Sequence, residues 1–181
     1  MALTDLQKRK LKRFFTVFDQ DRDGVIDRTD YMLLAENVSK AKGFPLDSPL
    51  SERVKECLLQ VWSNLEIIAD KNHDGHVTLE EFIEYREKLH EDDVKYGDLV
   101  TAGLTLFDVM DNNHDGKLEP HEFRAFYSFF QLDDDLADEM FERLDTEKAG
   151  YLTRNQIQTY SQAFNLGNDP DAVGNWLFGP Y

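Results

Sequence analysis

Apolar residues recur at helical spacing in four separate windows of the chain, each just ahead of a short polar stretch. The windows are Leu3, Leu6, Leu11, Phe14, Phe15 and Phe18; Val54, Leu58, Val61, Trp62, Leu65 and Ile68; Leu99, Leu104, Phe107 and Met110; and Leu136, Met140, Phe141 and Leu144. The apolar pattern resumes after each polar stretch, at Tyr31, Phe82, Phe123 and Ile157. We therefore predict eight helices, arranged as four helix–loop–helix units.

The first three polar stretches are copies of one twelve-residue pattern. Asp19, Asp70 and Asp111 open them, and Asp30, Glu81 and Glu122 close them at the twelfth position. Each copy has oxygen-bearing side chains at positions 1, 3 and 5, a glycine at position 6 and an aliphatic residue at position 8. This is the pattern of the EF-hand calcium loop. Three matches, each between helical patterns, predict three calcium sites.

The pattern also predicts which residues hold the ion. Calcium takes roughly six to eight oxygen ligands, and the loop supplies them from positions 1, 3, 5, 7 and 12. Position 7 contributes its backbone carbonyl, so the side chains there are irrelevant, and position 9 often acts through a water. The candidate ligands are Asp19, Asp21, Asp23, Val25 and Asp30; Asp70, Asn72, Asp74, His76 and Glu81; and Asp111, Asn113, Asp115, Lys117 and Glu122.

A fourth copy departs from the pattern at two ligand positions. It opens at Asp145 and keeps Gly150, but it has Ala149 at position 5 and Gln156 at position 12. A methyl group cannot ligate calcium, and a neutral amide is a poor substitute for a bidentate carboxylate. We therefore expect a structural loop that does not bind calcium.

The three predicted calcium sites differ in charge and reach. Loop 1 carries five acids at its possible ligand positions, loop 2 three and loop 3 four. Asp30 closes loop 1 in place of glutamate, which shortens the side chain by one methylene and makes bidentate capture harder. Magnesium prefers six ligands at about 2.0–2.1 Å. We therefore predict a mixed magnesium/calcium site in loop 1.

The aliphatic residues at position 8 predict how the hands pair. Ile26, Val77, Leu118 and Leu152 should form short antiparallel strand contacts between paired loops, joining hand 1 to hand 2 and hand 3 to hand 4. The predicted fold is all-α, with four EF-hands in two compact pairs. We expect an N-terminal pair over residues 1–92, a C-terminal pair over 93–165 and an apolar tail over 166–181, with a hinge at 90–98.

Composition narrows the classes of function. The chain has 181 residues, a net charge of -16 and 41% apolar residues. That acidity argues against nucleic-acid binding and against anionic lipid. No apolar run approaches the roughly 20 residues of a membrane span, and the N-terminus shows no signal-peptide pattern. We expect a cytoplasmic monomer whose partners are calcium and magnesium, with a protein target possible but not indicated.

Several residues suggest other chemistry but have a simpler explanation. The basic run Lys8, Arg9, Lys10, Lys12 and Arg13 could dock an acidic partner or a membrane, but we interpret it as the solvated face of the first helix. The five histidines show no zinc-ligand spacing. We expect Cys57, beside Leu58 on an apolar helix, to be a buried inert thiol. No Ser-His-Asp or phosphate-binding motif is present, so we do not expect an enzyme.

The core and the tail bear on whether the protein acts as a buffer or a sensor. Sensors present Met-rich grooves, whereas this chain has 4 Met and 13 Phe, which favours a fixed interior. The tail contains Trp176, Leu177, Phe178 and Tyr181. It could bind a partner, but we expect it to plug a groove between the hands, because it would otherwise expose an apolar patch.

The loop order, the silent fourth hand and the tail together resemble the sarcoplasmic calcium-binding protein family, with its calexcitin and photoprotein relatives. The opening Asp5–Leu11 and the ending Gly174–Pro180 look like the ends of that family. The resemblance implies a compact cytosolic calcium/magnesium buffer. Calexcitin-like members are regarded as sensors. Photoproteins usually use hands 1, 3 and 4, whereas here hand 2 is intact and hand 4 is degraded.

Three hypotheses about function follow. The first is a calcium buffer with three sites. The second is a calexcitin-like sensor that exposes apolar surface on calcium loading and binds a target. The third is a luciferin-binding relative of the photoproteins, which would need a cavity where we expect the tail to pack.

Overall fold

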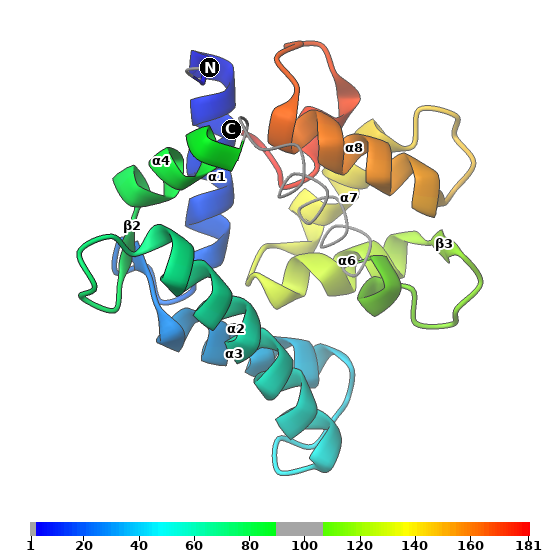
Figure 1. Cartoon of the computed structure of the whole chain (residues 1–181). Coiled ribbons are helices and arrows are strands. Elements are labelled where there is room, and N and C mark those ends of the chain that lie inside the picture. The colour runs from blue at the N-terminus through cyan, green and yellow to red at the C-terminus, as the bar shows by residue number, and fades with distance from the viewer. Residues whose placement is uncertain (1–2, 90–106) are drawn as a thin grey trace.

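The computed structural model describes residues 3–89 and 107–181 (Figure 1). The expected hinge at 90–98 lies outside these residues, as do Leu99 and Leu104 of the third apolar window. The division of the chain at residues 92 and 165 stays a prediction.

The described chain is mostly helical, as predicted. The helices are α1 (Asp5–Phe18), α2 (Arg28–Ala41), α3 (Pro49–Ala69), α4 (Leu79–Leu89), α6 (Pro120–Phe129), α7 (Asp134–Leu144) and α8 (Arg154–Leu166), and residues 107–110 are also helical. A short 3₁₀ helix, η1 (Val173–Trp176), lies in the tail. The strands are β1 (Val25–Ile26), β2 (Val77–Thr78), β3 (Lys117–Leu118) and β4 (Leu152–Thr153).

The helices that leave loops 1, 3 and 4 begin with capping boxes made from the loops themselves. Asp27 caps α2 and Asp30 is its N3 residue, while Thr153 and Gln156 do the same for α8. Side chains at these positions satisfy backbone N–H groups that have no partner within the helix. The residue at loop position 12 therefore closes the loop and starts the next helix.

The strand pairing joins the hands as predicted. β1 pairs antiparallel with β2, placing Ile26 opposite Val77, and β3 pairs antiparallel with β4, placing Leu118 opposite Leu152. All four position-8 side chains are buried, with exposed fractions of 0–1%. The strand contact therefore also forms the floor of each pair's apolar core.

Aromatic rings join the two pairs of hands into one packed interior. The buried residues form two clusters, and Phe14 and Phe18 of α1 pack against both. The ring of Phe14 lies 6.0 Å from that of Phe82 in the N-terminal pair and 5.1 Å from that of Phe178 in the tail. Phe18 lies 5.1 Å from Phe130, which follows α6. The apolar faces of the two pairs therefore face each other.

The later part of the tail, residues 174–179, lies mostly within this interior. Leu177 and Phe178 are each only 5% exposed, and the ring of Phe178 lies 4.9 Å from that of Phe164 in α8. Figure 1 shows the tail in red, running beside α8 toward the blue helix α1.

Part of the basic run binds the tail, so the interpretation of it as a solvated face was wrong for two residues. Lys10 is fully buried, and its Nζ donates to the carbonyl oxygens of Ala163 and Gly167 and to Oδ1 of Asn175. The Nε of Arg13 donates to the carbonyl oxygen of Phe178 over 2.7 Å. Lys8, Arg9 and Lys12 are exposed, as expected, whereas Lys10 and Arg13 lie on the side of α1 that meets α8 and the tail.

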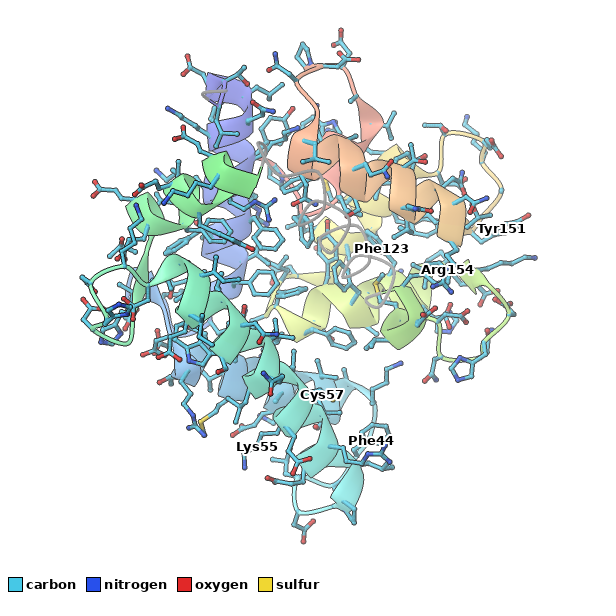
Figure 2. The ribbon with its side chains drawn as sticks, viewed as in Figure 1. Phe44, Lys55, Cys57, Phe123, Tyr151 and Arg154 are labelled. Atoms are coloured by element: carbon cyan, nitrogen blue, oxygen red, sulfur yellow. The ribbon has the colours of Figure 1, made fainter. Side chains whose placement is uncertain are left out.

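Helix α3 also differs from expectation. Cys57, labelled in Figure 2, is exposed rather than buried. Val61 and Ile68 are 50% and 51% exposed. Trp62 is buried at 3%. The helix packs chiefly against α2 and α4, so only one side is covered, and one residue step of about 100° turns Cys57 away from the half-buried Leu58.

No helix in the described parts of the chain combines the length and apolar character needed to cross a membrane.

Candidate metal centres

The carboxylate at position 1 organises each of the four loops from inside. It accepts a hydrogen bond from the glycine N–H at position 6, over 3.1 Å in loop 1, 3.0 Å in loop 2, 2.9 Å in loop 3 and 2.7 Å in loop 4. The glycines have φ between +78° and +93°, the left-handed region that glycine adopts most readily. The chain therefore turns sharply around the position-1 oxygen.

Positions 3 and 5 continue the turn in loops 1–3. The side-chain oxygen at position 3 accepts from the N–H at position 5, and the carboxylate at position 5 accepts from the N–H at position 7, all over 2.9–3.2 Å. These six bonds involve Asp21, Asp23 and Val25; Asn72, Asp74 and His76; and Asn113, Asp115 and Lys117. Each loop therefore gathers its predicted ligand side chains around one backbone turn.

The acid at position 12 closes each of these loops. One of its oxygens accepts from the N–H at position 2 and the other from the N–H at position 9. The distances are 2.7 and 2.7 Å for Asp30, 3.2 and 3.0 Å for Glu81, and 2.8 and 3.1 Å for Glu122. Asp30 reaches both partners despite its shorter side chain. Asp30 and Glu122 are each only 2% exposed.

The surroundings of Asp30 and Glu81 shift their pKa values in opposite directions. Burial raises the pKa of Asp30 to about 6, against the opposing effect of its three backbone hydrogen bonds. Hydrogen bonds from the Thr78 backbone lower the pKa of the more accessible Glu81. Burying an anion is costly unless a positive charge accompanies it, so the buried Asp30 favours a bound cation.

Loop 1 brings three carboxylates together. Asp19, Asp21 and Asp23 each place an oxygen so that the three atoms lie within 4.8 Å of one another. An all-oxygen set of this kind suits a hard divalent cation and is a poor match for softer metals. The three loops therefore fit the predicted ions in donor chemistry, and the ligand roles of the fifteen residues stay a prediction.

Loop 4 keeps the fold of the other loops with fewer candidate ligands. Asp145 accepts from the N–H groups of Ala149 and Gly150, over 2.9 and 2.7 Å. Oε1 of Gln156 accepts from the Thr153 N–H over 2.8 Å. This loop holds its shape through its own hydrogen bonds and offers no carboxylate at position 5 or 12.

Side chains also connect the loops within each pair. His76 Nδ1 lies 3.5 Å from Asp27 Oδ2, joining loop 2 to loop 1. Lys117 Nζ lies 4.2 Å from the ring centre of Tyr151, which joins loop 3 to loop 4. Arg154 makes a bidentate ion pair with Asp108 at 2.7 and 3.1 Å. Figure 2 labels Tyr151 and Arg154 at the side of the molecule where β3 lies.

Two residues at the sites escaped the sequence analysis. Lys42, just after α2, donates from Nζ to Asn112 Oδ1 of loop 3 over 3.2 Å. Gln131 donates from Nε2 to the carbonyl and side-chain oxygens of Gln20 in loop 1, over 3.2 and 3.1 Å. Both contacts cross between the pairs of hands, and no local pattern in the sequence reports such contacts.

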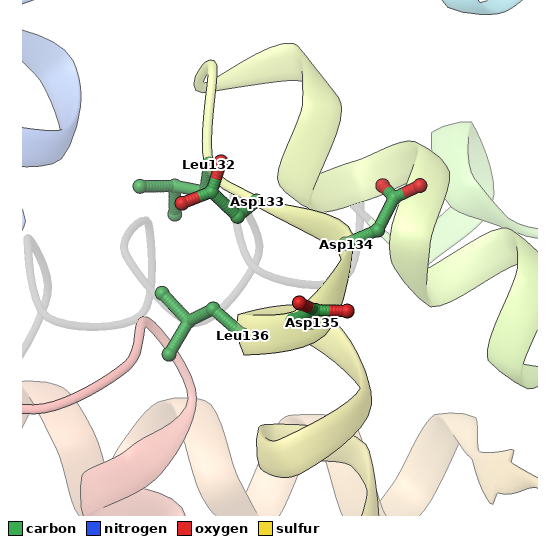
Figure 3. A pocket seen from close by; sticks show the side chains of 5 residues that line it. All are labelled: Leu132, Asp133, Asp134, Asp135 and Leu136. Atoms are coloured by element: carbon green, nitrogen blue, oxygen red, sulfur yellow. The ribbon is translucent and has the colours of Figure 1, made fainter.

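A surface depression lies at the turn between α6 and α7. It is lined by Leu132, Leu136 and the three aspartates between them (Figure 3). It is open to solvent and none of its lining residues belongs to a predicted calcium loop, so we assign it no role.

Comparisons with known proteins agree with the geometry. The EF-hand domain pair family matches residues 8–86, and the EF hand family matches residues 105–127. The chain is 30% identical to the alpha chain of a sarcoplasmic calcium-binding protein from Penaeus vannamei, over 91% of this chain and 90% of that protein.

Two solved structures share the fold across nearly the whole chain. A sarcoplasmic calcium-binding protein from amphioxus has a TM-score of 0.72 at 23% identity, covering 99% of this chain and 100% of that one. A calcium-loaded apo coelenterazine-binding protein from Renilla muelleri has a TM-score of 0.75 at 24% identity, with the same coverage. At these identities the likeness concerns the fold alone.

Proposed function

We propose that this chain, which belongs to the sarcoplasmic calcium-binding protein family of EF-hand proteins, is a calcium buffer. It binds calcium ions at loops 1, 2 and 3 and catalyses no reaction. The ligands are those predicted from the loop positions, with Val25, His76 and Lys117 acting through their backbone carbonyls. We place its action in the cytoplasm, as a monomer.

The observation that carries this proposal is the packing between the pairs of hands. A sensor that opens on calcium loading exposes an apolar groove in a pair of hands. Here Phe14 and Phe18 contact both clusters, and Phe178 of the tail packs on Phe14 and Phe164. The surfaces that a sensor would present to its target instead pack against each other, which favours a buffer.

Site 1 is proposed to exchange magnesium for calcium. Asp30 holds the N–H groups of positions 2 and 9 at 2.7 Å each, so the short side chain draws loop 1 in tightly. A tight loop with fewer oxygens in reach suits the smaller ion, which prefers six ligands. Resting magnesium would then have to leave before calcium binds.

A calexcitin-like sensor is the second candidate, and helix α3 favours it. Leu50, Val61, Ile67 and Ile68 are 50–74% exposed on this helix. Exposed apolar surface on a helix can bind a protein partner. The immobilised unmodified chain should then retain a partner protein in the presence of calcium. An immobilised variant with Ile67→Asp and Ile68→Asp on α3 should fail to retain it.

Binding of a luciferin-like ligand is a remote third candidate, suggested by the shared fold. Leu177 and Phe178 fill space between the described helices. A purified protein with absorbance beyond that of its aromatic residues would support this candidate and count against a simple buffer.

Calorimetric titration of metal-stripped protein with calcium tests the buffer proposal. With roughly millimolar magnesium present, we expect three calcium ions, with at least two sites tighter than about 10⁻⁷ M. Affinities near 10⁻⁶–10⁻⁵ M would place the protein in the sensor range. When magnesium is left out, the calcium affinity of site 1 should rise by a larger factor than those of sites 2 and 3.

Two variants test the assignment of active and silent loops. Glu122→Gln removes a closing carboxylate, so the stoichiometry should fall from three calcium ions to two. Asp145→Ala removes only a structural hydrogen-bond acceptor, so three ions should still bind. Loss of an ion in the second variant would contradict our assignment of loop 4.

A further inference from the structure

Helix α2 touches two predicted calcium sites in different pairs of hands. Its first turn contains Asp30, which closes loop 1. The residue at its C-cap is Lys42, whose Nζ donates to Asn112 Oδ1 of loop 3 over 3.2 Å. One rigid element therefore begins at site 1 and ends at site 3.

Lys42 lies close to the ligands of site 3. Asn112 is the second residue of loop 3, next to Asp111, and its N–H donates to Glu122 Oε1 over 2.8 Å. Burial lowers the pKa of Lys42, and the charges of Glu122 and Asp111 oppose that lowering. The hydrogen bond to Asn112 places the ammonium beside the loop whose carboxylates are expected to hold calcium.

The position of Lys42 is set by backbone contacts. Its N–H donates to the Val38 carbonyl oxygen over 3.0 Å, and Gly43 follows with φ of +69°, which ends the helix. The side chain therefore projects from a defined point rather than from a loose loop.

Hydrogen bonds fix α2 against the C-terminal pair. Asn37 Nδ2 donates to the Phe129 carbonyl oxygen at the end of α6 and to Gln20 Oε1, both over 3.1 Å. Gln131 also donates to Gln20, whose own N–H donates to Asp30. A movement of Asp30 is therefore linked, through few bonds, to the C-terminal end of α6, the helix whose first turn contains Glu122 of site 3.

We propose that Lys42 is a built-in cation of the third site, which lowers the calcium affinity of that site and makes it depend on occupancy of the first. This inference rests on the proposed function, since it requires calcium to bind loops 1 and 3. In the ion-free loop, the ammonium partly neutralises the carboxylates. The ammonium repels an incoming calcium ion, so calcium binds less tightly unless the ammonium moves away.

Occupancy of site 1 changes the effect of Lys42 on the calcium affinity of site 3, and it does so through α2. Ion binding engages the acid at position 12, which in loop 1 is Asp30, the N3 residue of α2. Because Asp30 lies at one end of α2 and Lys42 follows the other end, even the small shift of α2 that a buffer-type hand undergoes moves the ammonium relative to loop 3. Sites 1 and 3 therefore bind with positive coupling, which acts equally in both directions.

The first test removes the charge. Lys42→Gln should raise the calcium affinity of site 3 by about three- to tenfold, the size expected for one charge acting on a divalent ion near a protein surface. Lys40→Gln is the matched control, because Lys40 is an exposed lysine two residues away that pairs with Glu36 at 3.4 Å. Equal effects of the two substitutions would overturn the proposal.

The readout must separate the sites. The Gly116 N–H donates to Asp111 over 2.9 Å and the Gly24 N–H donates to Asp19 over 3.1 Å, so each amide resonance in ¹H–¹⁵N NMR reports ion binding at its own loop. In Lys42→Gln, the Gly116 titration should shift to lower calcium. Added KCl should shrink that shift by screening the charge.

The second test measures the coupling. Asp21→Ala weakens site 1 at an exposed ligand position, and the Gly116 titration should then move to higher calcium in the unmodified background. In the Lys42→Gln background, Asp21→Ala should change the calcium concentration at the midpoint of the Gly116 titration by less than about twofold. Equal displacements in the two backgrounds would refute the coupling. A Gly116 amide that never responds to calcium would instead overturn the proposed third site itself.

Discussion

At the scale of single residues, Lys10 shows how a buried charge can connect distant segments. Its three acceptors belong to α8, to the residue that ends α8 and to the tail, at 2.8–2.9 Å. Two of them are carbonyl oxygens at the C-terminus of α8, where the helix dipole favours a cation. The ammonium therefore caps α8 from α1 while it holds Asn175 in place.

The same burial makes stability depend on pH. Burial lowers the pKa of Lys10 from 10.5 to about 8, so between these values the unfolded chain holds a proton that the folded chain has released. Stability rises with pH wherever the unfolded state binds more protons. From pH 7.5 to 9.5, urea denaturation should show the free energy of unfolding rising by up to about 2 kcal/mol relative to Lys10→Met. Parallel pH curves for the two proteins would contradict this.

Cys57 should react in the folded state. Its side chain is exposed on α3, so a maleimide should modify it without denaturant, at a rate within about tenfold of a free peptide thiol at the same pH. Mass spectrometry of the native protein measures the rate, and Cys57→Ser provides the blank. Modification that appears only after unfolding would show that α3 is covered in solution.

At the scale of elements, the tail acts as part of the core. Phe178 is 5% exposed and contacts rings from α1, α6 and α8. Phe178→Ala should lower the free energy of unfolding by about 3–5 kcal/mol, because it leaves a cavity among aromatic rings. Tyr181→Ala, at the more accessible chain end, should cost less than about 1 kcal/mol by urea denaturation. Similar losses for both would mean that the tail packs differently.

Sequence reasoning succeeded where structure is local. The loops repeat a spacing that fixes their own hydrogen bonds, and the position-8 residues predict both strand pairings because they lie at fixed places in each loop. It failed for Lys10, Arg13 and Cys57, whose surroundings depend on which helices pack together. Nothing near Lys42 in the chain points to Asn112, which lies 70 residues away.

At the scale of the whole molecule, the dominant property is negative charge. The formal net charge is -16, and three calcium ions would add six positive charges to give -10. Repulsion among like charges destabilises a compact state, and salt screens it. Raising KCl should therefore increase the melting temperature of the ion-free protein more than that of the calcium-loaded protein, as calorimetry can measure. An equal increase would indicate that the carboxylates of the loops contribute little to the repulsion.

The internal hydrogen bonds of loop 4 affect how loop 3 closes around an ion. Asp145 and Gln156 hold that loop in its turn through hydrogen bonds of 2.7–2.9 Å, so β4 is in place without help from an ion. If loop 4 binds no ion, as we propose, loop 3 pairs with a strand whose position does not depend on calcium, whereas β1 and β2 both belong to loops that we expect to bind an ion. Less conformational entropy is lost when loop 3 closes. We therefore expect loop 4 to serve loop 3 as a preformed pairing partner, so that calcium binding at loop 3 is opposed by a smaller loss of conformational entropy than calcium binding at loops 1 and 2.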